Sequence, residues 1–87
     1  MGWRVEYSPA ALRHLKKIGR SAAADILDYM DSRIAANDPR RFGKPLRHDK
    51  FGLWRYRVRD YRVICELDAE HSIVIVQAIG HRSTIYD

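Results

Sequence analysis

The first residues of the chain alternate between apolar and charged side chains. Trp3, Val5 and Tyr7 would share one face of a strand, and Arg4 and Glu6 the other. Because successive side chains of a strand point to opposite faces, this pattern predicts a short strand at the start of the chain.

Two helices are expected next. Ser8 followed by Pro9 is typical of a helix start, because a serine oxygen accepts backbone N–H bonds there and proline suits the first turn. Gly19 is expected to end the first helix, and Ser21 to cap a second one that runs to about Ala36. So short a link predicts an antiparallel helical hairpin.

Period-two alternation returns in the second half of the chain. From residue 53 onward it predicts two strands joined by a tight turn at Arg59-Asp60. A last, almost wholly apolar run at residues 73–79 predicts a central strand. Together these elements predict one α+β domain over residues 1–87. The N-terminal strand and the helical hairpin would pack on one face of a mainly antiparallel sheet of about four strands.

The turn at Arg59 also sets a register. It pairs Val58 with Tyr61 and Arg57 with Arg62, and the apolar pairs then fall on one face. Like charges directly opposite each other destabilise a strand pair, and Arg55 lies on the same face, diagonal to Arg62. Arginine forks bind phosphate oxygens in pairs, so this patch is a candidate phosphate site. A solvated basic patch without a ligand is the alternative.

The charge distribution points to a polyanionic partner. The net charge of the chain is +5, but residues 39–62 alone hold nine basic and two acidic side chains. Concentrated positive charge of this kind is typical of surfaces that bind nucleic acids. Four of these residues are candidate substrate contacts beyond the three arginines already described: Lys44, Arg47, Lys50 and Arg59.

The C-terminal residues add groups that can move protons. After Gly80 come His81, Arg82 and Tyr86, which supply an imidazole, a cation and a phenol. A phosphodiester cleavage site uses such groups to transfer protons and to stabilise the pentavalent phosphate. No metal or other cofactor is expected, because the histidines lack partners at ligand spacing and the single cysteine, Cys65, falls on the apolar face.

Several blocks of the sequence resemble the RelE/ParE superfamily of bacterial toxins, and the RelE side most closely. They are W-R-Y-R-V at residues 54–58, D-Y-R-V-I at residues 60–64, and Gly80-His81-Arg82. The resemblance covers essentially the whole chain. It implies the toxin half of a type II toxin–antitoxin module, in the cytoplasm and without a membrane partner. A RelB-like antitoxin would hold the toxin in a hetero-oligomeric complex that binds operator DNA through the antitoxin.

Members of the RelE branch cleave mRNA on the 70S ribosome, so the resemblance implies a ribosome-dependent endoribonuclease. Arg57, Arg62 and Arg82 would hold the phosphate, Tyr86 or His81 would transfer protons, and Arg55 would position the substrate. The best-known RelE pattern has lysines where this chain has Arg55 and Arg57, and arginine is a poor general base. The alternative is the ParE branch, whose members inhibit DNA gyrase without cleaving RNA.

Overall fold

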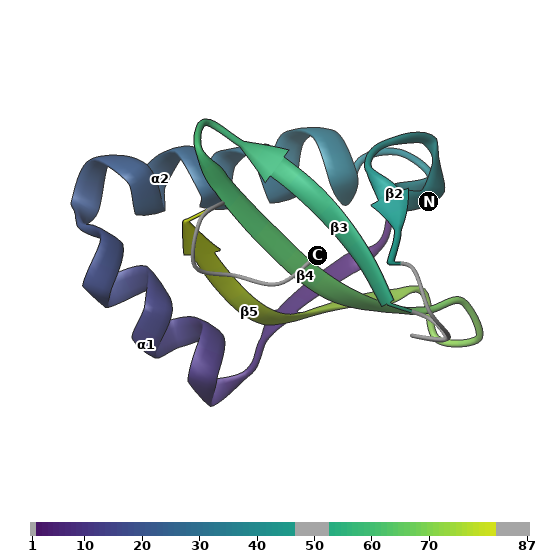
Figure 1. Cartoon of the computed structure of the whole chain (residues 1–87). Coiled ribbons are helices and arrows are strands. Elements are labelled where there is room, and N and C mark those ends of the chain that lie inside the picture. The colour runs from purple at the N-terminus through teal and green to yellow at the C-terminus, as the bar shows by residue number, and fades with distance from the viewer. Residues whose placement is uncertain (1, 47–52, 82–87) are drawn as a thin grey trace.

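The computed structural model describes residues 2–46 and 53–81 of the chain. Five strands form one sheet in the order β1-β5-β4-β3-β2 (Figure 1). Strand β1 runs parallel to β5, and the other neighbouring pairs are antiparallel. The elements in chain order are β1 Arg4–Tyr7, α1 Pro9–Ile18, α2 Arg20–Tyr29, the π-helical turn η1 Met30–Ile34, the 3₁₀ turn η2 Pro39–Arg41, β2 Lys44–Pro45, β3 Leu53–Val58, β4 Tyr61–Asp68 and β5 Ile73–His81.

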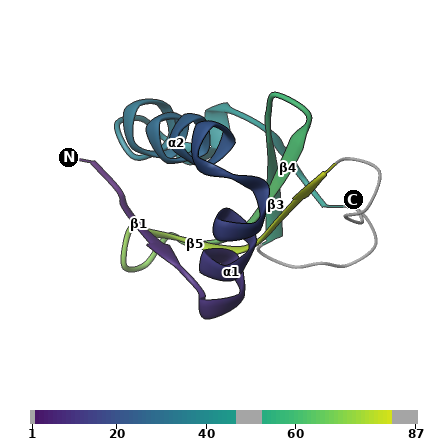
Figure 2. The ribbon, with the colours of Figure 1, turned by 90° about the vertical axis from the view of Figure 1, so that its left-hand side faces the viewer.

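This arrangement confirms the predicted α+β class and the mainly antiparallel sheet. The sheet has five strands instead of about four, because the two-residue strand β2 adds an outer strand. The N-terminal strand β1 does not pack on a face of the sheet as predicted but joins its edge beside β5. Figure 2 shows the sheet curving around α1 and α2, which lie together on its concave side. No helix within residues 2–46 and 53–81 is long and apolar enough to cross a membrane.

The start of α1 follows the prediction and the start of α2 does not. The Oγ of Ser8 accepts a hydrogen bond from the backbone N–H of Ala11 at 3.0 Å. Gly19 ends α1 with a φ of 96°, a backbone conformation that glycine adopts without strain. The same glycine precedes α2 directly, so the predicted Ser21 cap is wrong: Ser21 lies inside the helix.

The core lies between the helices and the concave face of the sheet. The helices contribute Ile26, Met30 and Ile34, all fully buried. The sheet contributes a second set of fully buried side chains, which includes Tyr56, Val63, Cys65, Val74 and Val76. Cys65 is buried as predicted, and burial raises the pKa of its thiol, so this cysteine is a packing residue.

The register of β3 and β4 agrees with the prediction residue for residue, including Arg57 opposite Arg62. Between β4 and β5 the register shifts. Cys65 pairs with Val76, but Ile64 pairs with Ala78, so Gln77 is an extra residue in β5. Such a bulge reverses which face the following side chains occupy.

Candidate phosphate site

Three arginines lie next to the short outer strand β2, on the face of the sheet that points away from the helices. Arg55 and Arg57 alternate with the buried Tyr56 and Val58, and Arg62 precedes the buried Val63. Alternation therefore directs the guanidinium groups outward. The pocket at this point has a volume of about 280 Å³ and is lined by Gly43, Lys44, Arg55, Tyr56, Arg57 and Arg62. We call it the arginine pocket.

The structure brings together four of the predicted site residues. Arg57 and Arg62 are direct cross-strand partners, Lys44 is the partner of Arg55, and all four line the arginine pocket. Concentrated positive charge in a small concave site raises its affinity for anions. A phosphate group is the ligand chemistry that matches arginine forks and a lysine ammonium.

One wall of the arginine pocket is formed by residues 39–46, which we call the strap. The strap contains η2 and β2 and runs along the outer edge of β3. Gly43 lies in it with a φ of 65°. A Cβ atom at this position would lie 2.1 Å from the carbonyl oxygen of Arg55, so glycine alone fits without displacing backbone. Sequence reasoning missed the role of Gly43, although a glycine beside Lys44 and Pro45 signals a special backbone.

Tyr56 lines the arginine pocket but is poorly suited to proton transfer. Its hydroxyl donates a hydrogen bond to the carbonyl oxygen of Pro39 at 2.9 Å, and its ring packs at a tilt against Tyr29. Burial raises the pKa of Tyr56, with the neighbouring Cys65, Tyr29 and Asp38 acting in the same direction. Tyr56 is therefore a structural part of the pocket wall.

Arg59 lies apart from the arginine pocket. It occupies the β3–β4 turn with a φ of 56°, and its side chain reaches α2. There its Nη1 lies 3.2 Å from the Oδ2 of Asp25, and 3.5 Å from the Oγ of Ser21. The structure thus places this predicted substrate contact beside the helices.

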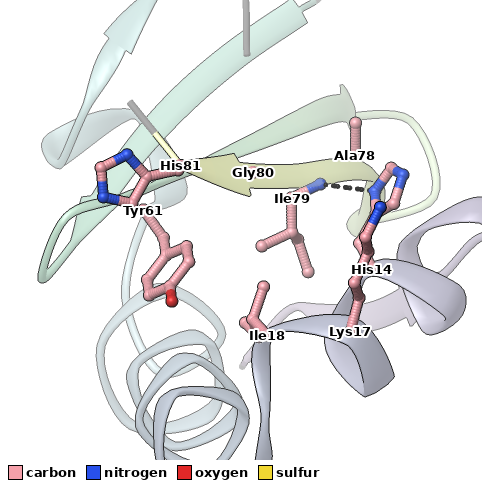
Figure 3. Close-up of a pocket in the computed structure, with 8 residues that line it drawn as sticks. All are labelled: His14, Lys17, Ile18, Tyr61, Ala78, Ile79, Gly80 and His81. Atoms are coloured by element: carbon pink, nitrogen blue, oxygen red, sulfur yellow. Dashed lines mark hydrogen bonds between the residues drawn. The ribbon is translucent and has the colours of Figure 1, made fainter. Parts of the chain in front are cut away.

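His81 also lies on the helix side of the sheet. Its cross-strand partner is Tyr61, and the two rings make an edge-on contact with centroids 5.8 Å apart. Both belong to a second pocket of about 580 Å³ (Figure 3), which we call the histidine pocket. The structure does not bring His81 to the arginines. The histidine pocket is lined by His14, Lys17, Ile18, Tyr61, Ala78, Ile79, Gly80 and His81.

His14 links α1 to the end of β5. Strand β1 ends at Tyr7, which pairs with Val76, so β5 continues beyond its parallel partner. The Nδ1 of His14 accepts a hydrogen bond from the backbone N–H of Ile79 at 3.0 Å (Figure 3). This bond satisfies a strand-edge donor and fixes His14 in the tautomer with its proton on Nε2.

Four predicted site residues, Arg47, Lys50, Arg82 and Tyr86, lie outside the described residues. Their roles stay predictions. Within the part of the chain that the structure describes, no group of three histidine, cysteine or acidic side chains is placed to hold a metal ion.

The chain has clear similarities to known proteins. The family model described as "ParE toxin of type II toxin-antitoxin system, parDE" matches residues 5–86. Toxin RelG of Mycobacterium tuberculosis is 30% identical over 86 residues, which cover 99% of this chain and 98% of that protein. Toxin RelE of the same organism is 34% identical over 84 residues, covering 97% of this chain and 86% of that protein.

Solved structures show the same fold. The crystal structure of the toxin–antitoxin complex RelBE2 from Mycobacterium tuberculosis contains a chain that matches with a TM-score of 0.86 and 28% identity, over 94% of this chain and 100% of that one. An archaeal RelE–RelB complex from Pyrococcus horikoshii matches in fold with a TM-score of 0.73 at 20% identity, over 98% and 100%. The chain therefore belongs to the ParE toxin family of type II toxin–antitoxin systems, and its similarity to RelE and RelG supports the RelE branch within it.

Proposed function

We propose that this toxin is a ribosome-dependent endoribonuclease that cleaves mRNA and so inhibits translation. The observation that carries the proposal is the arginine pocket, in which Arg55, Arg57, Arg62 and Lys44 meet on one face of the sheet. The similarity of the chain to proteins named RelE and RelG supports the same activity. Those names also make the alternative, inhibition of DNA gyrase in the manner of ParE, the less favoured one.

In the proposed reaction, the ribose 2′-oxygen attacks the adjacent phosphorus in line. The bond from phosphorus to the 5′-oxygen of the next nucleotide breaks, which leaves a 2′,3′-cyclic phosphate and a 5′-hydroxyl. One proton leaves the 2′-hydroxyl and one is delivered to the departing 5′-oxygen. Negative charge builds up on the non-bridging oxygens of the transition state, where preorganised cations stabilise it.

The described residues have distinct roles in this proposal. Arg57 and Arg62 stabilise the pentavalent phosphate, because they are cross-strand partners and line the same pocket. Arg55 and Lys44 hold the RNA backbone beside it. Arginine does not lose its proton near neutral pH, so the three arginines act through charge and hydrogen bonds to the phosphate and not as a general base.

Proton transfer needs a group outside the arginine pocket. His81 is poorly placed for it, because its ring packs on Tyr61 on the helix side of the sheet. We therefore assign proton transfer to Tyr86 and a further phosphate contact to Arg82, as the RelE resemblance implies. The ribosome supplies the in-line geometry of the RNA, which lowers the demand on a strong base.

A toxin with this activity also requires a partner protein that inhibits it. The matching structure from Mycobacterium tuberculosis is a toxin–antitoxin complex, and the one from Pyrococcus horikoshii is a RelE–RelB complex. We propose that this chain is likewise held by a cognate RelB-like antitoxin. Expression of the chain alone should arrest growth, and co-expression with the protein encoded next to it should restore growth and give a complex that co-purifies. Normal growth with the chain alone at high level would contradict the proposal.

The test of the activity compares two targets. The purified toxin should cleave mRNA on translating ribosomes and should leave gyrase supercoiling unchanged. The variant Arg57→Gln should lose most of the cleavage, whereas Arg20→Gln, an exposed arginine at the start of α2, should cleave like the parent. Inhibition of supercoiling without mRNA cleavage would refute the proposal in favour of the gyrase alternative.

A further inference from the structure

The strap that carries Lys44 has little backbone pairing of its own. Strand β2 is only two residues long, and its second residue, Pro45, has no N–H to donate. Beyond it, the N–H of Leu46 donates to the carbonyl oxygen of Leu53 at 3.2 Å. Strands this short are not stable by their ladder alone, so another interaction must hold the strap on β3.

Repulsion between like charges destabilises the pairing of the strap with β3. Lys44 lies directly opposite Arg55 in the register of β2 and β3. Like charges at opposed positions destabilise a strand pair, and Arg57 and Arg62 add further positive charge to the same pocket. The like charge of Arg55 therefore opposes the pairing of Lys44 with β3.

Two aromatic side chains of β3 donate hydrogen bonds to backbone carbonyl groups of the strap. The indole Nε1 of Trp54 donates a hydrogen bond to the carbonyl oxygen of Phe42 at 2.6 Å. The hydroxyl of Tyr56 donates to the carbonyl oxygen of Pro39 at 2.9 Å. The Trp54 bond reaches the residue directly before Gly43, whose left-handed backbone turns the chain into Lys44. Of these two bonds, the Trp54 bond is therefore the one nearer to Lys44 along the chain.

We propose that Trp54 is a positioning residue that holds Lys44 in the arginine pocket, so that the ammonium is preorganised for an RNA phosphate. This inference rests on the proposed function and assigns to Trp54 an effect that passes entirely through Lys44. A residue that only stabilises the fold would weaken RNA binding whether or not Lys44 is present.

The experiment is a double-mutant cycle with Trp54→Phe, Lys44→Ala and the combined variant. The probe is a single-stranded RNA with a 2′-deoxy residue at the cleavage position, bound by the full chain over a series of salt concentrations. Each single variant should bind several-fold more weakly, with the log–log salt slope reduced by roughly 0.7, the value for one phosphate contact on a single strand. In the Lys44→Ala background, Trp54→Phe should have no further effect. Additive losses would overturn the inference.

A second readout follows the strap without RNA. Hydrogen exchange at the amide of Leu46 reports opening of the strap from β3. Trp54→Phe should accelerate this exchange about tenfold, and Lys44→Ala should slow it because the repulsion from Arg55 is removed. Exchange that Trp54→Phe leaves unchanged would also overturn the inference. If Trp54→Phe does not fold, Tyr56→Phe takes its place in both measurements, because it removes one oxygen atom and the second bond to the strap.

Failure of the proposed function can be distinguished from failure of the positioning role of Trp54. A parent chain that neither binds the RNA nor cleaves mRNA on ribosomes refutes the proposed function. A parent that binds and cleaves, combined with additive effects of Trp54→Phe and Lys44→Ala, refutes only the positioning role of Trp54.

Discussion

The two faces of β3 and β4 are made by alternate residues of the same strands, and they differ in almost every physical respect. On the helix side Tyr56 and Val63 are fully buried. On the opposite face Arg57 and Arg62 stand across from each other in a small concave pocket. Since neighbouring residues contribute to stability on one face and to the site on the other, adjacent substitutions should have opposite consequences.

The largest expected effect is on activity, at Arg62. Arg62→Ala should reduce single-turnover mRNA cleavage on ribosomes by about 10²–10³, the typical loss for one preorganised charge stabiliser. Stability should change by less than about 1 kcal/mol, because Arg62 lies on the outer face of the sheet and its removal relieves the repulsion from Arg57. Thermal melts and cleavage on the same purified variant test both parts. A variant that melts well below the parent yet still cleaves would refute the phosphate role of Arg62.

The neighbouring residue should behave in the opposite way. Val63→Ala removes two methyl groups from a fully buried side chain and leaves a cavity, so the free energy of unfolding should fall by about 2 kcal/mol. Cleavage per folded molecule should stay near the parent value, measured at a temperature where both proteins are folded. A large loss of cleavage here would show that the two faces are coupled.

Gly43→Ala should lower stability and RNA binding together, unlike the substitutions at Arg62 and Val63. The new Cβ would meet the carbonyl oxygen of Arg55 and the ring of Tyr56, on top of the strain at a φ of 65°. We expect a loss of about 1–3 kcal/mol in stability together with weaker RNA binding, because the strap must move. Gly19→Ala is the matched control: its φ is also positive, but nothing lies within 4 Å of the added Cβ. It should lower stability and leave RNA binding unchanged.

Arg59→Gly tests whether Arg59 belongs to the RNA-binding site. Glycine relieves the positive φ of 56°, a gain of about 1 kcal/mol, and the lost ion pair with Asp25 is exposed and contributes about 0–1 kcal/mol. Stability should therefore change by less than about 1 kcal/mol, and RNA affinity should stay within about twofold of the parent. A clear loss of affinity would instead support the sequence-based prediction that Arg59 contacts substrate. Asp25→Asn separates the ion pair from the arginine itself.

The smallest expected effect concerns pH. A hydrogen bond from the backbone N–H of Arg40 holds the pKa of Asp38 below its usual range, with the Arg40 and Arg41 side chains lowering it further. A carboxyl with a lowered pKa stabilises the fold above its unfolded value of about 4 and loses that contribution as pH falls through the folded value. Asp38→Asn keeps an oxygen acceptor but does not titrate. The stability advantage of the parent should therefore be constant at neutral pH and shrink on acidification, as followed by thermal melts.

The sequence predicted the arginine patch because alternation and the turn at Arg59 together define a register. It could not place His81, because the bulge at Gln77 reverses the faces in β5. Counted from the buried Val74 and Val76, Ile79 and His81 would point away from the helices; with the bulge they point toward them. A bulge has no signature in hydrophobic alternation, so this reversal appears only in the structure.

Other differences have local causes. The strand at Lys44 was missed because two residues, one of them a proline, carry no alternation. The Ser21 cap was predicted from residue type alone, whereas Gly19 supplies the turn that starts α2. The role of the strap depends on hydrogen bonds from Trp54 and Tyr56 to carbonyl groups at least twelve residues away, which no local pattern encodes.

The outer strands of the sheet also bear on how the protein behaves when concentrated. An open strand edge is a template for pairing with another chain, which leads to aggregation or strand exchange. Here one edge is β2, only two residues long and interrupted by Pro45, and the other is the four-residue β1, which carries the charged Arg4 and Glu6. Short, charged or proline-containing edges discourage such pairing. The apolar strands β4 and β5 stay in the interior of the sheet, and only the end of β5 beyond Val76 extends past its parallel partner β1. The same topology that forms the site therefore protects most of the sheet against fibre-like association.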